Sequence, residues 1–384
     1  MHAFAFEVIA RILPAVCFFC SLIFIPQVDA HTPESLISGL KAGTLTLGEI
    51  NDHLARSDIT PDFEDQVHSR LKAHFSANNF NFIGLNRTLR DAADKQITLD
   101  QVLNAQPAKT GYRQHSKTNL PATSDQPSAI PFKVPVSEPP FSNSGKIVMR
   151  QGDNIIFCTA HLIAPGFLLT AAHCFGGDYD ISQLVWYQAF DQGTFTNAIK
   201  PLWIAHNKNY DRAITNAEST IIQPTRQEEA NAVDAGFDYV LFGIPQDNTQ
   251  SQGNPIQCFN SGNSNWVSRT GLQIGYGATY GGNNELYATH VTIKDIIKDP
   301  DGPLAEQLGV WMTLYDGISL GEGASGGPFL FSNANETEMA ISGSLTGSLT
   351  YDDGSTYQFG PTFLAGSNFA RFIAAHGIPA SGCK

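Results

Sequence analysis

The chain has 384 residues, of which 42% are hydrophobic and 15% are charged. This length is enough for one large core or for two ordinary ones. The formal net charge is −13, from 36 acidic and 23 basic residues, and the basic residues form no cluster. The acidic balance therefore speaks against nucleic acid as a partner, and it says little about the fold.

The first 30 residues differ in composition from the rest of the chain. Arg11 precedes the apolar stretch ILPAVCFFCSLIFIPQV, and Val28-Asp29-Ala30 closes it with a small residue. This order is typical of a secretory signal peptide that is cleaved after Ala30. A membrane anchor is the alternative, but the apolar run is short and contains two prolines. We therefore expect residues 1–30 to be a signal peptide and the mature chain to be secreted without a membrane segment.

Four cysteines remain once the signal peptide is removed. An even number of cysteines in an exported chain suggests two disulfide bonds. The four are too dispersed along the sequence for a zinc site, and we expect neither a metal nor a cofactor. The cysteines are Cys158, Cys174, Cys258 and Cys383.

Residues 31–105 are polar and have helical patterning. Thr32-Pro33-Glu34 and Pro61-Asp62-Phe63-Glu64 each have the composition of a helix start. Apolar residues recur every fourth position from Phe63 to Phe75, which is an amphipathic spacing. Residues 107–141 are rich in proline, so we expect an extended linker there.

After Gly145 the pattern changes to short apolar runs separated by Gly, Asn, Asp and Ser. These runs have the length of strands and are bounded by turn residues. Near the end, FARFIAAH leads into Gly377 and Pro379, which predicts a short helix with a glycine stop. We expect an all-β domain, as in paired barrels or a sandwich. The predicted strands are KIVMR, NIIFC, GFLLT, YVLFGI, LQIGYG, THVTIK and AISGSL.

Two segments contain residues suited to acid–base chemistry. In CTAHLIAPGFLLTAAHCF, a bond between Cys158 and Cys174 would fix the backbone beside His173, and a histidine held in this way can act as a general base. A buried structural histidine is the alternative. In GFDYVLFGIP, Asp238 opens an apolar run, and a buried carboxylate needs a partner such as a histidine N–H. The alternative for Asp238 is a turn residue that caps the strand.

The stretch GEGASGGPFL surrounds Ser325 with small residues. It matches G-x-S-x-G, the nucleophile elbow of α/β-hydrolases, for which Asp352 or Asp353 and His376 could complete a triad. An elbow needs a strand before the serine and a helix after it. Here a loop composition precedes the serine and a strand composition follows it, and the elbow leaves LTAAHC without a role.

Taken together, LTAAHC, DYVLF and GASGGP resemble the three signature segments of the chymotrypsin-like (trypsin-like) serine proteases. His173, Asp238 and Ser325 also follow the order of that family. The resemblance covers roughly residues 141–384 and includes the turn Gly275-Tyr276-Gly277. It implies an all-β fold of two six-stranded antiparallel β-barrels with a short C-terminal helix, preceded by a mainly helical pro-region.

The resemblance also implies a role for each residue. Ser325 would attack the scissile carbonyl, His173 would take and return its proton, and Asp238 would orient His173. The N–H groups of Gly323 and Ser325 would form the oxyanion hole. Cys158 and Cys174 match the disulfide that the family places around its histidine, which leaves Cys258 and Cys383 for a second bond.

The sequence departs from the digestive members of the family at Ala324. Those members have Asp before the nucleophile, where it pairs with the new N-terminus after activation. Bacterial members similar to glutamyl endopeptidases also lack this acid, but the strand at 339–344 has no histidine, so a preference for glutamate is not supported. The resemblance places the pocket floor at Ser319, a substrate-facing serine at Ser342 and the pocket walls at Gly343 and Ser344. A neutral floor favours an uncharged substrate side chain.

We therefore expect a signal peptide at 1–30, a propeptide at 31–130 and a protease domain at 131–384. Activation would be a cut near Lys117 or Lys133. The expected protein is a monomeric, secreted serine endopeptidase that acts on proteins or peptides, with no nucleic-acid partner. A silent binding protein on the same fold is the alternative function, and an accessory domain is the alternative for 31–130.

Overall fold

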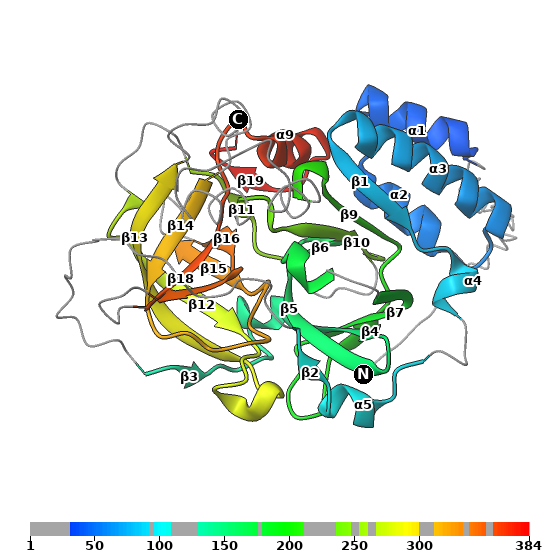
Figure 1. The fold of residues 1–384 in the computed structure, drawn as a ribbon. Helices are drawn as coiled ribbons and strands as arrows, with labels where there is room; N and C mark the ends of the chain where they lie inside the picture. The colour runs from blue at the N-terminus through cyan, green and yellow to red at the C-terminus, as the bar shows by residue number, and fades with distance from the viewer. Residues whose placement is uncertain are drawn as a thin grey trace, which may run out of the picture.

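The computed structural model describes residues 31–91, 96–108, 130–175, 179–210, 236–246, 253–259, 266–298, 311–332, 338–350 and 356–383. Within these residues the chain is mostly β, and its strands form two curled sheets that lie side by side (Figure 1). The predicted signal peptide and the two candidate acids Asp352 and Asp353 lie outside the described residues, as does Lys117.

The first sheet has nine strands in the described part of the chain, in the order β1-β9-β10-β6-β5-β4-β7-β8, with β2 paired to β5. The bounds are β1 Phe80–Gly84, β2 Gln106–Pro107, β4 Ser144–Gln151, β5 Asn154–Ala164, β6 Phe167–Thr170, β7 Tyr179–Gln188, β8 Asn197–Ile199, β9 Trp203–Asn207 and β10 Val240–Gly243.

The second sheet has ten strands within the same described ranges, in the order β17-β18-β14-β13-β12-β15-β16-β11-β19, with β3 paired to β13. The bounds are β3 Phe132–Lys133, β11 Ile256–Gln257, β12 Thr270–Gly275, β13 Tyr287–Lys298, β14 Trp311–Asp316, β15 Pro328–Ser332, β16 Met339–Ser344, β17 Gly347–Thr350, β18 Thr356–Thr362 and β19 Ala380–Ser381.

The predicted all-β architecture is confirmed. Each of the seven apolar runs forms a strand, as β4, β5, β6, β10, β12, β13 and β16. Short additional strands join both sheets, so each is larger than the six strands expected. The C-terminal helix is also present as α9, Asn368–Ala375, and Gly377 follows it with a positive φ of 67°.

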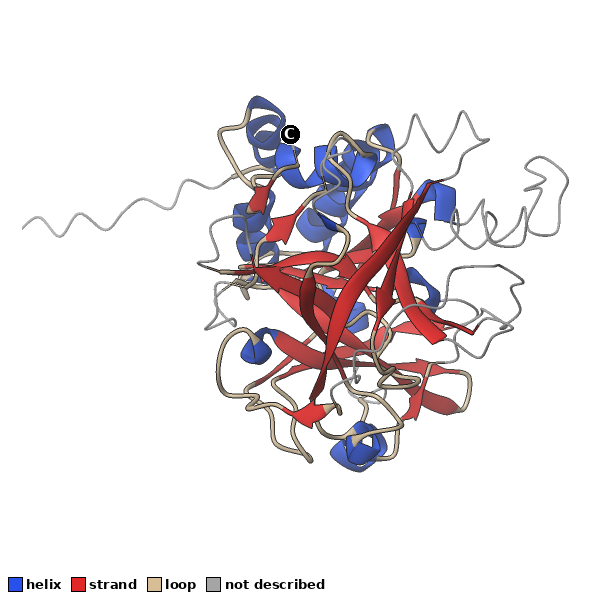
Figure 2. Ribbon diagram, turned by 90° about the vertical axis from the view of Figure 1, so that its left-hand side faces the viewer, coloured by secondary structure: helices blue, strands red, loops and turns tan. Residues whose placement is uncertain are grey.

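Helices dominate the N-terminal segment, as its composition predicts. Thr32 and Thr60 cap α1 and α3 through their hydroxyl groups, and proline follows each cap. Val67, Leu71 and Phe75 form the fully buried face of α3. The helices are α1 Pro33–Ala42, α2 Leu47–Ala55, α3 Pro61–Ala77, α4 Arg87–Arg90 and α5 Leu99–Leu103. Figure 2 shows most of the helical turns gathered at one end of the crossed strands.

The N-terminal segment shares a core with the first sheet. Strand β1 pairs antiparallel with β9, and β2 pairs parallel with β5. The ring of Phe75 lies 5.1 Å from that of Trp203 and 5.2 Å from that of Phe372 in α9. Trp203 Nε1 donates to Asn51 Oδ1 at 2.6 Å, and Asn51 Nδ2 donates to the Gly166 carbonyl at 3.0 Å. The described residues of the N-terminal segment therefore pair with the first sheet and pack against it.

None of the helices in the described ranges has the length and apolar character needed to cross a membrane.

Candidate active site

Adjacent strands bring His173 and Asp238 together. His173 lies in the 3-10 turn Ala172–Phe175, directly after β6, and Asp238 precedes β10, which pairs with β6. Asp238 is fully buried, and its two carboxylate oxygens bind the backbone N–H and the Nδ1 of His173, both at 2.7 Å. Because an ionised carboxylate only accepts hydrogen bonds, it fixes the proton on Nδ1 and leaves Nε2 as the basic nitrogen.

A disulfide bond holds the turn that contains His173. Cys174 is bonded to Cys158 in β5, and Cys258 is bonded to Cys383, so both expected pairs are present. The groups of Cys158, His173 and Cys174 are close enough to suggest a metal cluster in this described part of the chain. The two sulfurs are bonded to each other, however, and a disulfide offers no thiolate to a metal.

Ser325 lies in the loop between β14 and β15. Its carbonyl accepts the N–H of Thr159 at 2.9 Å, and Thr159 follows the bridged Cys158, so the serine loop joins β5 beside the histidine turn. Among the described residues, no hydrogen bond joins Ser325 Oγ to His173 Nε2. In proteins without substrate such catalytic contacts are often long and shorten in the bound complex.

The alternative nucleophile elbow is wrong. Strand β15 begins at Pro328, so a strand rather than a helix follows the serine. His376 ends α9, where its Nε2 lies 3.4 Å from His74 Nε2 and its ring stacks on Phe75. Burial lowers the pKa of His376 to about 3, so it stays neutral within this aromatic cluster.

Two N–H groups of the serine loop are free to bind an anion. In the described part of the chain, neither Gly323 N–H nor Ser325 N–H donates a hydrogen bond. The Glu322 carbonyl accepts from the Ala278 N–H at 2.8 Å. Because this peptide is trans, the Gly323 N–H points away from Ala278.

Gly323 is required at its position for two reasons. Its φ is 87°, which is costly for any residue with a Cβ, and a Cβ would lie 2.4 Å from the ring of Phe157. Gly326 is similar, with a φ of 81° and a Cβ position 2.0 Å from Thr170 Oγ1. The glycines of GEGASGGPFL thus allow the loop to pass directly over β5 and β6.

Thr159 is a residue at this site that the sequence reading missed. Its buried Oγ1 donates to the Gly323 carbonyl at 2.9 Å and accepts the Tyr276 N–H at 3.0 Å. The only sequence signal was a threonine in a strand of apolar residues, where a hydroxyl needs a partner.

Ala324 is fully buried in an apolar cluster with Leu320 and Phe329. A Cβ added at Gly275 would lie 2.8 Å from the Ala324 Cβ, so the neighbouring turn packs closely against this methyl group. The surroundings of Ala324 are therefore built for an apolar side chain.

A small cavity opens at His173. It has a volume of about 320 Å³, and its wall includes His173, Cys174 and the segment Gln106–Ala108 from the N-terminal region. The Ala108 N–H donates to the Phe157 carbonyl at 2.9 Å, continuing the pairing of β2 with β5. The N-terminal segment thus lies beside the histidine, a contact that the sequence did not indicate.

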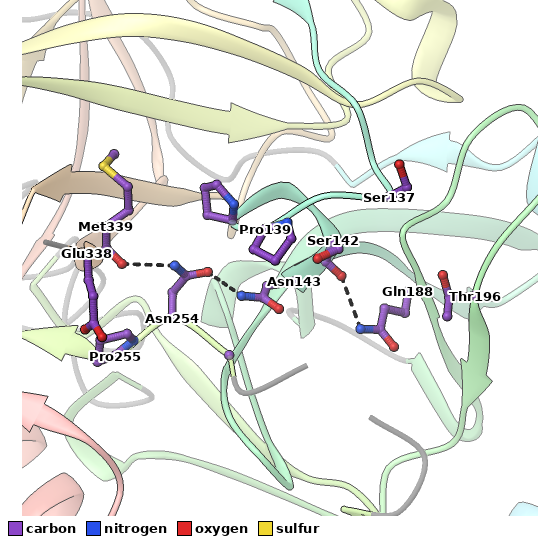
Figure 3. Close-up of a pocket in the computed structure, with 12 residues that line it drawn as sticks. Ser137, Pro139, Ser142, Asn143, Gln188, Thr196, Asn254, Pro255, Glu338 and Met339 are labelled. Carbon is purple, nitrogen blue, oxygen red and sulfur yellow. Dashed lines mark hydrogen bonds between the residues drawn. The ribbon is translucent and has the colours of Figure 1, made fainter. Parts of the chain in front are cut away.

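A larger pocket of about 700 Å³ contains none of the predicted catalytic residues. Figure 3 shows Asn143 and Asn254 in its wall, joined through Asn143 Nδ2 and Asn254 Oδ1 at 2.5 Å. Asn254 Oδ1 also lies 3.0 Å from His161 Nε2, and His161 Nδ1 lies 2.8 Å from Ser144 Oγ. Burial lowers the pKa of His161 to about 4, so this network is neutral.

The three predicted pocket residues lie on two elements. Ser319 Oγ accepts from the Gly321 N–H at 3.2 Å and from Ser348 Oγ at 3.1 Å. Ser342 and Ser344 alternate along β16, are fully buried, and have hydroxyl groups without a partner among the described residues. These hydroxyl groups offer hydrogen bonds but no charge.

A model of the trypsin family matches residues 138–373, which is more than half of the chain. Similar solved structures include a thermostable serine protease from an extremophilic microorganism (19% identity, TM-score 0.39, 62% of this chain and 97% of that chain). They also include a Glu endopeptidase (16% identity, TM-score 0.42, 64% of this chain and 96% of that chain). A third is a protease from Arthrobacter nicotinovorans (16% identity, TM-score 0.39, 62% of this chain and 96% of that chain). A search of curated proteins found no match.

Proposed function

We propose, for a chain that belongs to the trypsin family of serine endopeptidases, that Ser325, His173 and Asp238 form its catalytic triad. Ser325 Oγ attacks the peptide carbonyl while His173 Nε2 takes the hydroxyl proton and then passes it to the leaving amine. Water hydrolyses the acyl-enzyme by the same route. The observation that carries this proposal is the buried Asp238 carboxylate, which binds both the backbone N–H and the Nδ1 of His173.

The negative oxygen of the tetrahedral intermediate would be bound by the N–H groups of Gly323 and Ser325. The substrate side chain before the scissile bond would enter beside Ser319, Ser342 and Ser344. Because these residues supply hydroxyl groups and no charge, we expect small or apolar side chains to be preferred over Lys, Arg or Glu.

Secretion is part of the proposal. The two disulfide bonds are typical of an oxidising compartment, and they agree with the secretory signal expected at residues 1–30. We further propose that the chain is made as a latent precursor, because Gln106–Ala108 occupies one wall of the cavity at His173. A peptide approaching the edge of β5 would meet this segment first.

A cut in the linker would leave the N-terminal segment bound. Lys146 is fully buried and donates to the Val102 carbonyl at 2.8 Å, while Asn51 bonds to Trp203. Lys133 is a poor site for the cut, because it lies in β3 and forms ion pairs with Asp191 and Glu285. We therefore place activation near Lys117, and we expect both fragments to coelute in size-exclusion chromatography without denaturant. Separation of the fragments would show that residues 31–108 act as a released propeptide.

The test compares the intact chain with a chain cut at a site-specific protease sequence placed at 115–121. Release of peptides from an unfolded protein substrate measures activity. We expect the cut protein to be the more active form. The Ser325→Ala and His173→Ala variants should each lose about 10⁶-fold in turnover, whereas His376→Ala should retain it. No hydrolysis by the cut wild-type protein, with its fold intact, would identify a silent binding protein instead.

A further inference from the structure

Thr159 donates hydrogen bonds to the carbonyl groups of both residues that flank Ala324, Gly323 and Ser325. Thr159 Oγ1 donates to the Gly323 carbonyl at 2.9 Å, and the Thr159 N–H donates to the Ser325 carbonyl at 2.9 Å. The Thr159 carbonyl in turn accepts from Thr170 Oγ1 at 2.6 Å. Thr159 is fully buried, so these contacts are not in competition with water.

The hydroxyl group of Thr159 is oriented by a second contact. The Tyr276 N–H donates to Thr159 Oγ1 at 3.0 Å, which leaves the single hydroxyl proton for the Gly323 carbonyl. Tyr276 is itself fixed, because its side-chain hydroxyl donates to the Phe190 carbonyl at 2.8 Å. The hydroxyl of Thr159 therefore connects β5, the Tyr276 turn and the serine loop.

The orientation of the Gly323 carbonyl affects where the N–H groups of Gly323 and Ser325 point. Gly323 has a positive φ and no side chain, so its backbone can rotate more easily than that of its neighbours. Rotation of the peptide planes around Gly323 would move its N–H away from the Ser325 N–H. The Ala278 N–H holds the plane before Gly323, and Thr159 holds the plane after it.

We propose that Thr159 is a positioning residue that keeps the oxyanion hole formed. The proposal rests on the proposed function of Gly323 and Ser325. It explains how a loop with an apolar residue at 324 can be ordered without a carboxylate in that position. In the structure these contacts coexist with the attached N-terminal segment, so the hole needs no new N-terminus to form.

The test replaces Thr159 with Val, which keeps the shape and removes the hydroxyl, and with Ser, which keeps the hydroxyl. We expect Thr159→Val to lower kcat by about 10- to 100-fold, less than the loss of a direct oxyanion donor, and to change KM less than threefold. Thr159→Ser should restore most of kcat. Thr313→Val removes another buried hydroxyl, bonded to Thr362 Oγ1, and should leave kcat unchanged.

A second readout separates positioning from a loss of structure. A peptide aldehyde forms a tetrahedral adduct with an oxyanion, whereas the matching peptide acid binds as a product. Thr159→Val should weaken the aldehyde in parallel with kcat and leave the affinity of the acid unchanged. Equal weakening of both ligands, or unchanged binding of both, would overturn the proposal. If Thr159→Val does not fold, Thr159→Ala gives the same comparison.

The two proposals fail in different ways. If the cut wild-type protein neither hydrolyses peptides nor binds the aldehyde, the proposed function is wrong. If the wild-type protein is active and Thr159→Val has the same kcat, only the role of Thr159 is wrong.

Discussion

Two buried histidines in the described part of the chain have polar side-chain partners, and we propose a catalytic role for one of them. His173 faces the carboxylate of Asp238 through Nδ1, while His161 lies between Ser144 Oγ and the carboxamide oxygen of Asn254. A carboxylate stabilises the imidazolium that forms during proton transfer, and a neutral amide does so far less. A buried histidine near a serine is therefore not enough to identify a catalytic site. The histidine also needs a buried carboxylate bound to one ring nitrogen, while the other ring nitrogen stays available to accept a proton.

The largest difference between the two sites concerns their serines. Ser325→Ala should abolish peptide hydrolysis, by about 10⁶-fold in kcat, because the attacking oxygen is lost. Ser144→Ala is the matched control. Ser144 is fully buried against His161 and should be replaceable with kcat/KM within about twofold of wild type. Equal losses in both variants would break the distinction.

The next effect concerns the acid. Asp238→Asn should lower kcat by about 10⁴-fold, because an amide can hold the wrong tautomer of His173 and cannot stabilise its charge. The fold should survive, since the substitution preserves shape. Activity of Asp238→Asn near the wild-type level would show that the carboxylate has only a structural role.

Asn254 should matter for stability rather than for turnover. Asn254→Ala leaves the buried Asn143 and His161 without a common acceptor. We expect a loss of about 1–3 kcal/mol in the free energy of unfolding, measured by urea denaturation, with kcat unchanged. A selective loss of kcat would instead link this network to catalysis.

The last prediction concerns the pH dependence of the free energy of unfolding. Burial lowers the pKa of His161 to about 4 from its ordinary value near 6.5, so the unfolded chain binds a proton that the folded chain excludes. The free energy of unfolding therefore keeps its full value above pH 6.5 and decreases as the pH falls towards 4. His68 and His376 act in the same direction. His161→Gln should reduce the slope of the free energy of unfolding against pH between pH 4 and 6.5 by the equivalent of about one proton. Urea denaturation at each pH measures this slope.

The strands and the order of the candidate triad could be predicted because both depend on local patterns. Apolar runs bounded by turn residues predict strands from local sequence alone. The candidate residues His173 and Ser325 lie within the short motifs LTAAHC and GASGGP. The C-terminal helix was predictable for the same reason. Its Gly377 has the positive φ that ends a helix.

The remaining features depend on contacts between distant residues. Lys146 belongs to a predicted strand, but nothing local indicates that its ammonium reaches the Val102 carbonyl and Asn284, at sequence separations of 44 and 138. The pattern of residues 31–105 predicts helices, whereas Phe80–Gly84 forms a strand that pairs with β9. Thr159 likewise contacts the backbones of Gly323 and Tyr276, at sequence separations of 164 and 117.

We propose that His173 and Asp238 activate Ser325. The most direct measurement is to treat the cut protein with a fluorophosphonate and to locate the adduct by peptide mass spectrometry. We predict one adduct, on Ser325, that disappears in His173→Ala and persists in the His161→Gln variant. No adduct on correctly folded cut protein, or an adduct that survives Ser325→Ala, would contradict it.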